Sequence, residues 1–137
     1  MKINFSDLNP PMWFYFDDDD PESGRVLIKS LSPKEGEQLM KECSKKMPPE
    51  YRGGHRYEIP DKLDEKKYNR MLWDAVILDW ENLVDEKDEP IPCTADNKLR
   101  LMYEAPFFLE FITKNLKIMD ANRDQRMEQV EKNSSTT

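Results

Sequence analysis

The side chains that could carry out catalysis or bind a metal are few in this chain. It has one histidine, His55, and two cysteines, Cys43 and Cys93. A general base needs an orienting partner and a cysteine nucleophile needs an activating group, and the neighbouring residues supply neither. A structural zinc site requires about four nitrogen or sulfur ligands, more than these residues offer. We therefore expect an exposed, passive histidine, two reduced cysteines that serve packing, and no metal site.

Two acidic segments could suggest other chemistry. Asp17–Asp20 invites comparison with a calcium loop, but counting from Asp18 the sixth residue is Ser23 and the twelfth is Lys29, where an EF-hand needs Gly and Glu. The segment Asp79–Glu89 could hold the paired carboxylates of a glycosidase, which would also need a large sugar-binding cleft. Phosphate-binding and nucleophile-elbow motifs are absent from the sequence. We expect two solvated turns, no cofactor and no enzymatic activity.

Composition points to a charged protein that meets other proteins. The chain has 137 residues, of which 36% are charged and 37% hydrophobic, and its net charge is −7. This length favours a single domain, and the acidic balance disfavours binding to nucleic acid. No apolar run approaches the roughly 20 residues that span a membrane, and the N-terminus lacks a signal-peptide pattern. We expect a protein of the cytoplasm that does not bind membranes.

The first half of the chain predicts a small sheet and one helix. Residues 1–11 are predicted to form an N-terminal arm, which ends in two prolines. Met12–Phe16 and Arg25–Leu31 are rich in strand-forming residues and are joined by a turn-rich loop, which predicts an antiparallel hairpin. Ser32 is followed by Pro and, three residues after the Ser, by Glu, so it should cap a helix to about Lys46.

The second half predicts three further helices. Glu50–Pro60 could be a third short strand or a loop over the hairpin. Apolar residues at helical spacing predict a helix over Asp61–Trp80. Thr94 should cap a short helix, Ala95–Glu104, and Pro106 suits the first position of a last helix.

Together these elements predict an α+β fold in which a small N-terminal antiparallel hairpin precedes about four helices. We expect a single domain over residues 12–119. Residues 120–137 should form a C-terminal helix extension that ends in a disordered tail, Lys132–Thr137, because its composition is polar.

The last predicted helix has the strongest apolar stripe of the chain. We expect Phe107, Phe108 and Phe111 to pack in the core, and also Trp80 at the end of the predicted helix over Asp61–Trp80. The stripe fades beyond residue 119, and a helix that outruns its core is a candidate for self-association or for gripping a partner helix. The predicted partner-binding residues, with Trp80 as scaffold, are Phe111, Leu116, Met119 and Met127.

One stretch has a distinctive order of residues. Leu78-Asp79-Trp80-Glu81 is followed by the acidic turn Val84-Asp85-Glu86, then by Pro90-Ile91-Pro92-Cys93-Thr94, and Asn97-Lys98-Leu99 opens the next helix. This order, strongest from Tyr68 to Ile112, resembles the central pattern of tail assembly chaperones of long-tailed phages.

The sequence departs from that family at one position in the acidic turn. Members of the family often have Gly before the Glu-Pro step, where this chain has Asp88. Asp tolerates the left-handed backbone better than most other residues, so we expect the turn to survive.

The resemblance implies a non-enzymatic assembly factor in the host bacterial cytoplasm. Such chaperones coat the tape measure protein before the tail tube polymerises round it, and some have a longer frameshifted form that recruits tail tube protein. Self-association is a further possibility. Two alternatives stay open: a structural minor tail protein retained in the virion, and an acidic DNA mimic that inhibits DNA-binding proteins.

Overall fold

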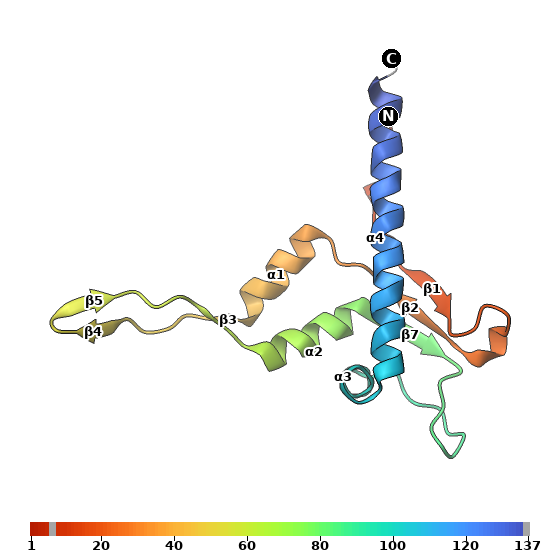
Figure 1. Ribbon diagram of the computed structural model, residues 1–137, viewed down its shortest axis with the longest axis horizontal. Helices are drawn as coiled ribbons and strands as arrows, with labels where there is room; N and C mark the ends of the chain where they lie inside the picture. The colour runs from red at the N-terminus through yellow and green to blue at the C-terminus, as the bar shows by residue number, and fades with distance from the viewer. Residues whose placement is uncertain (6–7, 136–137) are drawn as a thin grey trace.

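The computed structural model describes residues 1–5 and 8–135, with side chains as far as Arg123. It consists of a body, in which a long helix lies across a three-stranded sheet, and a hairpin arm that projects from one side (Figure 1). The elements of the body are β1 (Met12–Tyr15), a short 3-10 turn (Pro21–Ser23), β2 (Arg25–Ile28), α1 (Pro33–Cys43), α2 (Glu65–Val76), β7 (Ile77–Glu81), α3 (Ala95–Glu104) and α4 (Pro106–Ser135). The α+β class predicted from the sequence is confirmed.

The sheet has the order β1-β2-β7, and both strand pairs are antiparallel. The β1–β2 hairpin is the predicted one, but β7 replaces the last turn of the helix expected over Asp61–Trp80. Ile77 and Trp80 are three residues apart, which is the spacing of one face of a helix and not of a regular strand. The predicted helix was therefore extended wrongly to Trp80. A bulge in the register, with Ile28 opposite Ile77 and Val26 opposite Trp80, places both β7 residues on the buried face.

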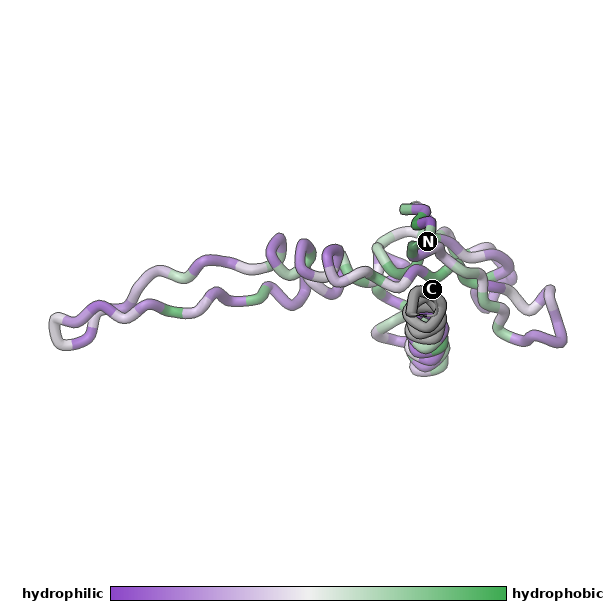
Figure 2. Tube along the Cα trace, turned by 90° about the horizontal axis from the view of Figure 1, so that it is seen from above, coloured by the Kyte–Doolittle hydropathy of each residue, from purple (hydrophilic) through white to green (hydrophobic). Residues whose placement is uncertain are grey.

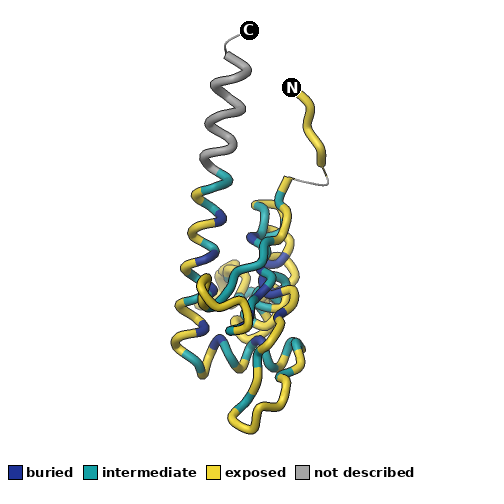
Figure 3. Tube along the Cα trace, turned by 90° about the vertical axis from the view of Figure 1, so that its right-hand side faces the viewer, coloured by how far each residue is buried: buried dark blue, intermediate teal, exposed yellow. Residues whose placement is uncertain are grey.

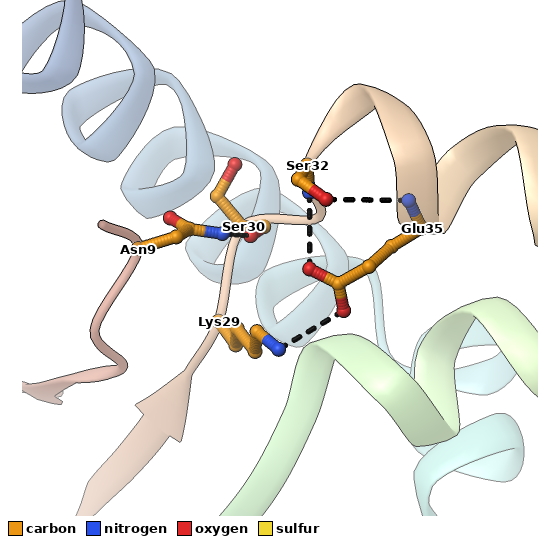
Figure 4. Close-up of polar contacts among 5 residues, drawn as sticks. All are labelled: Asn9, Lys29, Ser30, Ser32 and Glu35. Atoms are coloured by element: carbon orange, nitrogen blue, oxygen red, sulfur yellow. Dashed lines mark hydrogen bonds and ion pairs between the residues drawn. The ribbon is translucent and has the colours of Figure 1, made fainter. Parts of the chain in front are cut away.

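Local sequence signals begin the helices as expected. Ser32 and Glu35 form a capping box at the start of α1 (Figure 4): Ser32 Oγ accepts from the Glu35 backbone N–H at 3.2 Å, and the Glu35 carboxylate accepts from the Ser32 N–H at 3.3 Å. The same carboxylate binds Lys29 Nζ at 2.9 Å. Thr94 caps α3 through the Asn97 N–H, and Pro106 is the first residue of α4.

The core lies where α4 meets the sheet and the other helices. Its buried side chains are Val26, Ile28, Val76, Ile77, Trp80, Met102, Phe108, Ile112 and Met119. Figure 3 shows these buried positions of α4 along the part of the helix that faces the sheet. α1 packs on α2, α2 on α3, and α3 on α4, so the helices form a continuous layer beside the sheet.

The segment between α1 and α2 forms the arm. Its base is β3 (Ser44–Lys45) paired with β6 (Lys62–Leu63), and its tip is β4 (Glu50–Arg52) paired with β5 (His55–Tyr57). Figures 1 and 2 show it standing off the body, with hydrophilic residues along most of its length. The stretch expected to be a third strand or a loop over the first hairpin is therefore a hairpin of its own.

Three further helix ends differ from the sequence prediction. α2 begins at Glu65 instead of near Asp61, because Lys62 and Leu63 pair with β3. α1 stops at Cys43 instead of near Lys46, because the next two residues pair with β6. α4 continues through Ser135, so the part of the expected disordered tail before Thr136 is helical, and Thr136 and Thr137 lie outside the described residues. Once packing has nucleated a helix, each further residue adds one backbone hydrogen bond and loses the conformational entropy of only one residue, so α4 can extend beyond the core.

Candidate functional site

The residues with reactive side chains lie apart from one another. His55 is exposed at the tip of the arm, Cys43 is buried in contact with Met71, and Cys93 is half-buried beside the core. Burial raises the pKa of the Cys93 thiol, which disfavours the nucleophilic thiolate. Among the described side chains, those of residues 1–5 and 8–123, no group of three or more His, Cys, Asp or Glu is arranged to hold a metal ion.

The acidic segments use carboxylates to close turns. Asp17 Oδ1 accepts from the Asp19 N–H at 3.0 Å, and Asp20 Oδ1 accepts from the Glu22 N–H at 3.1 Å. In the second segment, Asp85 Oδ1 accepts from the backbone N–H groups two and four residues later. Both turns are largely exposed, as predicted from the sequence, but residues 79–81 of the second segment belong to β7 and are not part of a turn.

The stretch that resembles the chaperone family is held together by internal contacts. Trp80 is 6% exposed, donates Nε1–H to the Ile91 carbonyl at 2.7 Å, and packs edge-on against Phe108. The Asn97 side-chain amide donates to the Pro92 carbonyl at 2.9 Å. These contacts fix the connector between β7 and α3 against the body, and Trp80 therefore has the scaffold position expected of it.

Two charged residues of this stretch are also structural. The ammonium of buried Lys98 reaches the Asp74 carboxylate at 2.9 Å, which joins α3 to α2. Asp88 has a φ of 59°, so the left-handed turn expected at this position is present with Asp in place of Gly.

The apolar stripe of α4 faces the body. Phe108 and Ile112 are fully buried, Met119 is 6% exposed, and Phe111 and Leu116 are partly buried against the same core. The residues predicted for partner binding thus pack inward along much of their surface. The side chain of Met127 lies outside the described residues.

Phe107 differs from its neighbours. It was expected in the core, and that prediction is wrong because its side chain is 63% exposed. Phe107 is the second residue of α4 and lies one turn before Phe111 on the same side of the helix. It is the most exposed aromatic residue of this helix among the described side chains.

An apolar pocket opens beside Phe107. We call it the Phe107 pocket; its volume is about 440 Å³ and it is lined by Phe16, Ser23, Leu83, Phe107 and Phe111. The rings of Phe16 and Phe111 lie 4.5 Å apart and form one wall. A pocket of this kind can accept an apolar side chain from a partner protein. The pocket could not be predicted from residue spacing, because its walls come from the β1–β2 loop, the connector and α4.

A second hollow lies between the connector and α3. We call it the connector groove; its volume is about 540 Å³. Its lining combines the carboxylate-bearing residues Asp85, Glu86 and Glu104 with the apolar residues Pro90, Ile91 and Leu101. Arg100 also borders it and is bound to Glu104 at 2.6 Å. The mixture suits a ligand that offers both a cation and an apolar group.

None of the described helices is long and apolar enough to cross a membrane. No curated protein sequence and no solved structure matches the chain. A family model described as "YdaY prophage protein" matches residues 33–133, which include α1, α2, α3 and all but the last two residues of α4, but not the β1–β2 hairpin. Because this match covers most of the chain, the protein belongs to the YdaY prophage protein family.

Proposed function

We propose that this protein is a non-enzymatic chaperone of phage tail assembly that binds and solubilises the tape measure protein in the host cytoplasm. Its membership of a prophage family and the resemblance of residues 68–112 to tail assembly chaperones support this function. The structural observation that carries the proposal is the Phe107 pocket, an apolar site beside an exposed phenylalanine on a chain with a net charge of −7.

The Phe107 pocket has the features of an anchor site for a helical partner. Phe107 stands at its edge with most of its ring in solvent, and Phe111 forms the inner wall. Exposed aromatic rings beside a pocket are typical centres of protein interfaces, since they bury a large area at little entropic cost. A tape measure protein is long and helix-prone, so an apolar residue from each of its exposed stripes could enter such a pocket.

The surroundings of the pocket suit reversible binding. Its apolar area is small, so one contact would be weak and release during tube assembly would be easy. The net charge of −7 would keep a complex with an apolar partner in solution. Recruitment of tail tube protein by a longer frameshifted product fits the same function and is part of the proposal.

Co-expression with the tape measure protein encoded beside this chain tests the proposal. We expect the tape measure protein to become soluble and to co-elute with the chain, and we expect Phe107→Glu to abolish both effects. Met40→Glu is the matched control, because Met40 is a similarly accessible apolar residue on α1, away from the pocket. A tape measure protein that is equally insoluble with and without the chain contradicts the proposal.

Mass spectrometry of purified virions separates this function from that of a minor tail protein. An assembly chaperone should be absent from finished particles, whereas a structural component should be present in a fixed ratio to the tube protein.

A further inference from the structure

The tip of the arm lacks a partner within the described part of the chain. β4 and β5 form a two-stranded sheet by themselves, and all residues from 50 to 58 are exposed. An isolated two-stranded hairpin is marginally stable in water and leaves two open strand edges. The Gly53-Gly54 turn, with φ of 57° and 79°, gives the hairpin its tight reversal but no additional packing. A surface of this kind gains most from docking onto another molecule.

Charge is divided unevenly between arm and body. Residues 44–63 contain five Lys or Arg and three Asp or Glu, a net charge of +2. The whole chain has a net charge of −7, so the remaining residues carry −9. The arm is therefore much less acidic than the body: Lys45, Lys46 and Lys62 lie toward its base, and its tip from Glu50 to Glu58 has no net charge. The arm can thus approach the acidic body of another copy without the repulsion that two bodies would meet.

One face of the hairpin presents an aromatic ring beside a cation. Tyr51 lies opposite Arg56 in the register, so both side chains project from the same face. Tyr51 is 68% exposed, and Arg56 is exposed while bound to Glu58 at 2.8 Å. Arg52 projects from the opposite face, where it is bound to Glu50 at 2.8 Å and where the only ring of a tyrosine, Tyr57, is less exposed, at 49%. The two faces thus provide a natural comparison.

The connector groove has an apolar part and an acidic part, which complement the tyrosine ring and the guanidinium of this face. Its apolar residues Pro90 and Ile91 suit a tyrosine ring, and the carboxylate of Glu86 suits a guanidinium. We propose that the Tyr51–Arg56 face of the arm docks into the connector groove of a second copy of this chain. The guanidinium of Arg56 would then lie between Glu58 of its own hairpin and Glu86 of the other copy.

The position of the two surfaces makes the contact intermolecular. Figure 1 shows the arm projecting from one side of the body and the connector between β7 and α3 on the other. A chain cannot fill its own groove, and each copy would offer one arm and one groove. Two copies that exchange arms reciprocally would form a two-fold dimer, and a contact made in one direction only would generate a closed ring or an open filament.

A nucleic acid is the less suitable occupant. Binding to phosphates grows with the number of phosphates that Lys and Arg neutralise. The tip from Glu50 to Glu58 has two Arg and two Glu, and each Arg is already bound to one of these carboxylates. One aromatic ring with one cation fits a groove with apolar and acidic parts better than a phosphate backbone.

Sedimentation velocity on the full chain at low and high salt tests the proposal. We expect wild-type protein to self-associate reversibly, and more weakly at high salt. Arg56→Glu and Tyr51→Ala on the arm, and Glu86→Arg in the groove, should each weaken association by about tenfold or more. Arg52→Glu is the matched control on the opposite face of the same hairpin and should have a much smaller effect, although it makes the same change in net charge.

Mixing variants gives the sharpest result. Tyr51→Ala has a damaged arm and an intact groove, whereas Glu86→Arg has the reverse, so an equimolar mixture can form one intact contact. We expect this mixture to contain dimers and no larger species, although each variant alone is monomeric.

Three results would overturn the proposal: a wild-type chain that is monomeric at low salt and high concentration, equal weakening by Arg52→Glu and Arg56→Glu, or a monomeric chain whose arm binds a DNA duplex. None of them bears on the tail-assembly function, which is tested separately through Phe107.

Discussion

Residues 71–101 and the arm, residues 44–63, are neighbours in the sequence but use their polar side chains in opposite ways. In the first region the side chains of Trp80, Asn97 and Lys98 bind Ile91, Pro92 and Asp74, and so join β7, the connector, α3 and α2 to one another. In the arm, Arg52 and Arg56 bind only carboxylates two residues away, and their side chains remain in water. The first region thus builds the scaffold, whereas folding of the body does not account for the exposed residues of the arm.

The largest effect on folding should come from Trp80. Trp80→Ala removes a buried ring that packs on Phe108 and leaves the Ile91 carbonyl without its indole donor, so we expect a loss of about 3–5 kcal/mol in the free energy of unfolding. Urea unfolding measures it. Trp80→Phe should recover part of the loss, because it restores the ring but not the hydrogen bond. A loss below about 1 kcal/mol would contradict the scaffold role.

The second largest loss of folding stability should come from a substitution of Gly24. Its φ is 107°, and a Cβ there would lie 3.0 Å from the backbone oxygens of Glu81 and Asn82. We expect Gly24→Ala to cost about 1–3 kcal/mol through strain and crowding at the end of the sheet. Gly36 in α1 is the control with the opposite sign: a Cβ there meets nothing within 4 Å, so Gly36→Ala should stabilise by about 0.5–1 kcal/mol. Thermal unfolding of both variants compares them directly.

The capping box of α1 should contribute less, and with a dependence on pH. Ser32→Ala should cost about 1 kcal/mol. The hydrogen bond from Lys29, with those from Ser32, lowers the pKa of Glu35, so its stabilisation is present above the ordinary Glu pKa and is lost as pH falls through the folded-state value.

Glu35→Gln tests this sign. Because the carboxylate is partly exposed, we expect a loss of only about 0.5 kcal/mol at neutral pH. Urea unfolding in acid should show no difference between Glu35→Gln and wild type. A difference that persists unchanged in acid would assign the effect to packing instead.

The smallest effect should come from the arm. Tyr51→Ala and Arg56→Glu should change the unfolding free energy of the monomer by less than about 0.5 kcal/mol, because both side chains are exposed. Urea unfolding at high salt and low protein concentration isolates the monomer. A larger loss would show that the arm helps to stabilise the body and would remove the contrast between the two regions.

Sequence reasoning succeeded where the signal was local. Ser32, Thr94 and Pro106 each begin a helix as expected, because a cap acts within one turn. It failed for β7, whose apolar residues fit a helix as well and whose partner strand lies about 50 residues earlier. The Phe107 pocket was missed for the same reason, since three distant segments form it. Contacts between segments that are distant in the sequence produce no regular residue spacing, so they cannot be predicted from the sequence pattern.

The β3–β6 pair at the base of the arm also divides the chain into two complementary parts. Ser44 and Leu63 lie opposite each other there, so the ends of the arm meet at the body. A protease cut between Gly53 and Gly54 would separate β1, β2 and α1 from α2, β7, α3 and α4. Neither fragment holds the whole sheet, because β7 pairs with β2 across the cut. Two separately expressed halves should therefore reassemble into one fold, and the Gly pair becomes the natural position at which to split this protein or to insert a reporter.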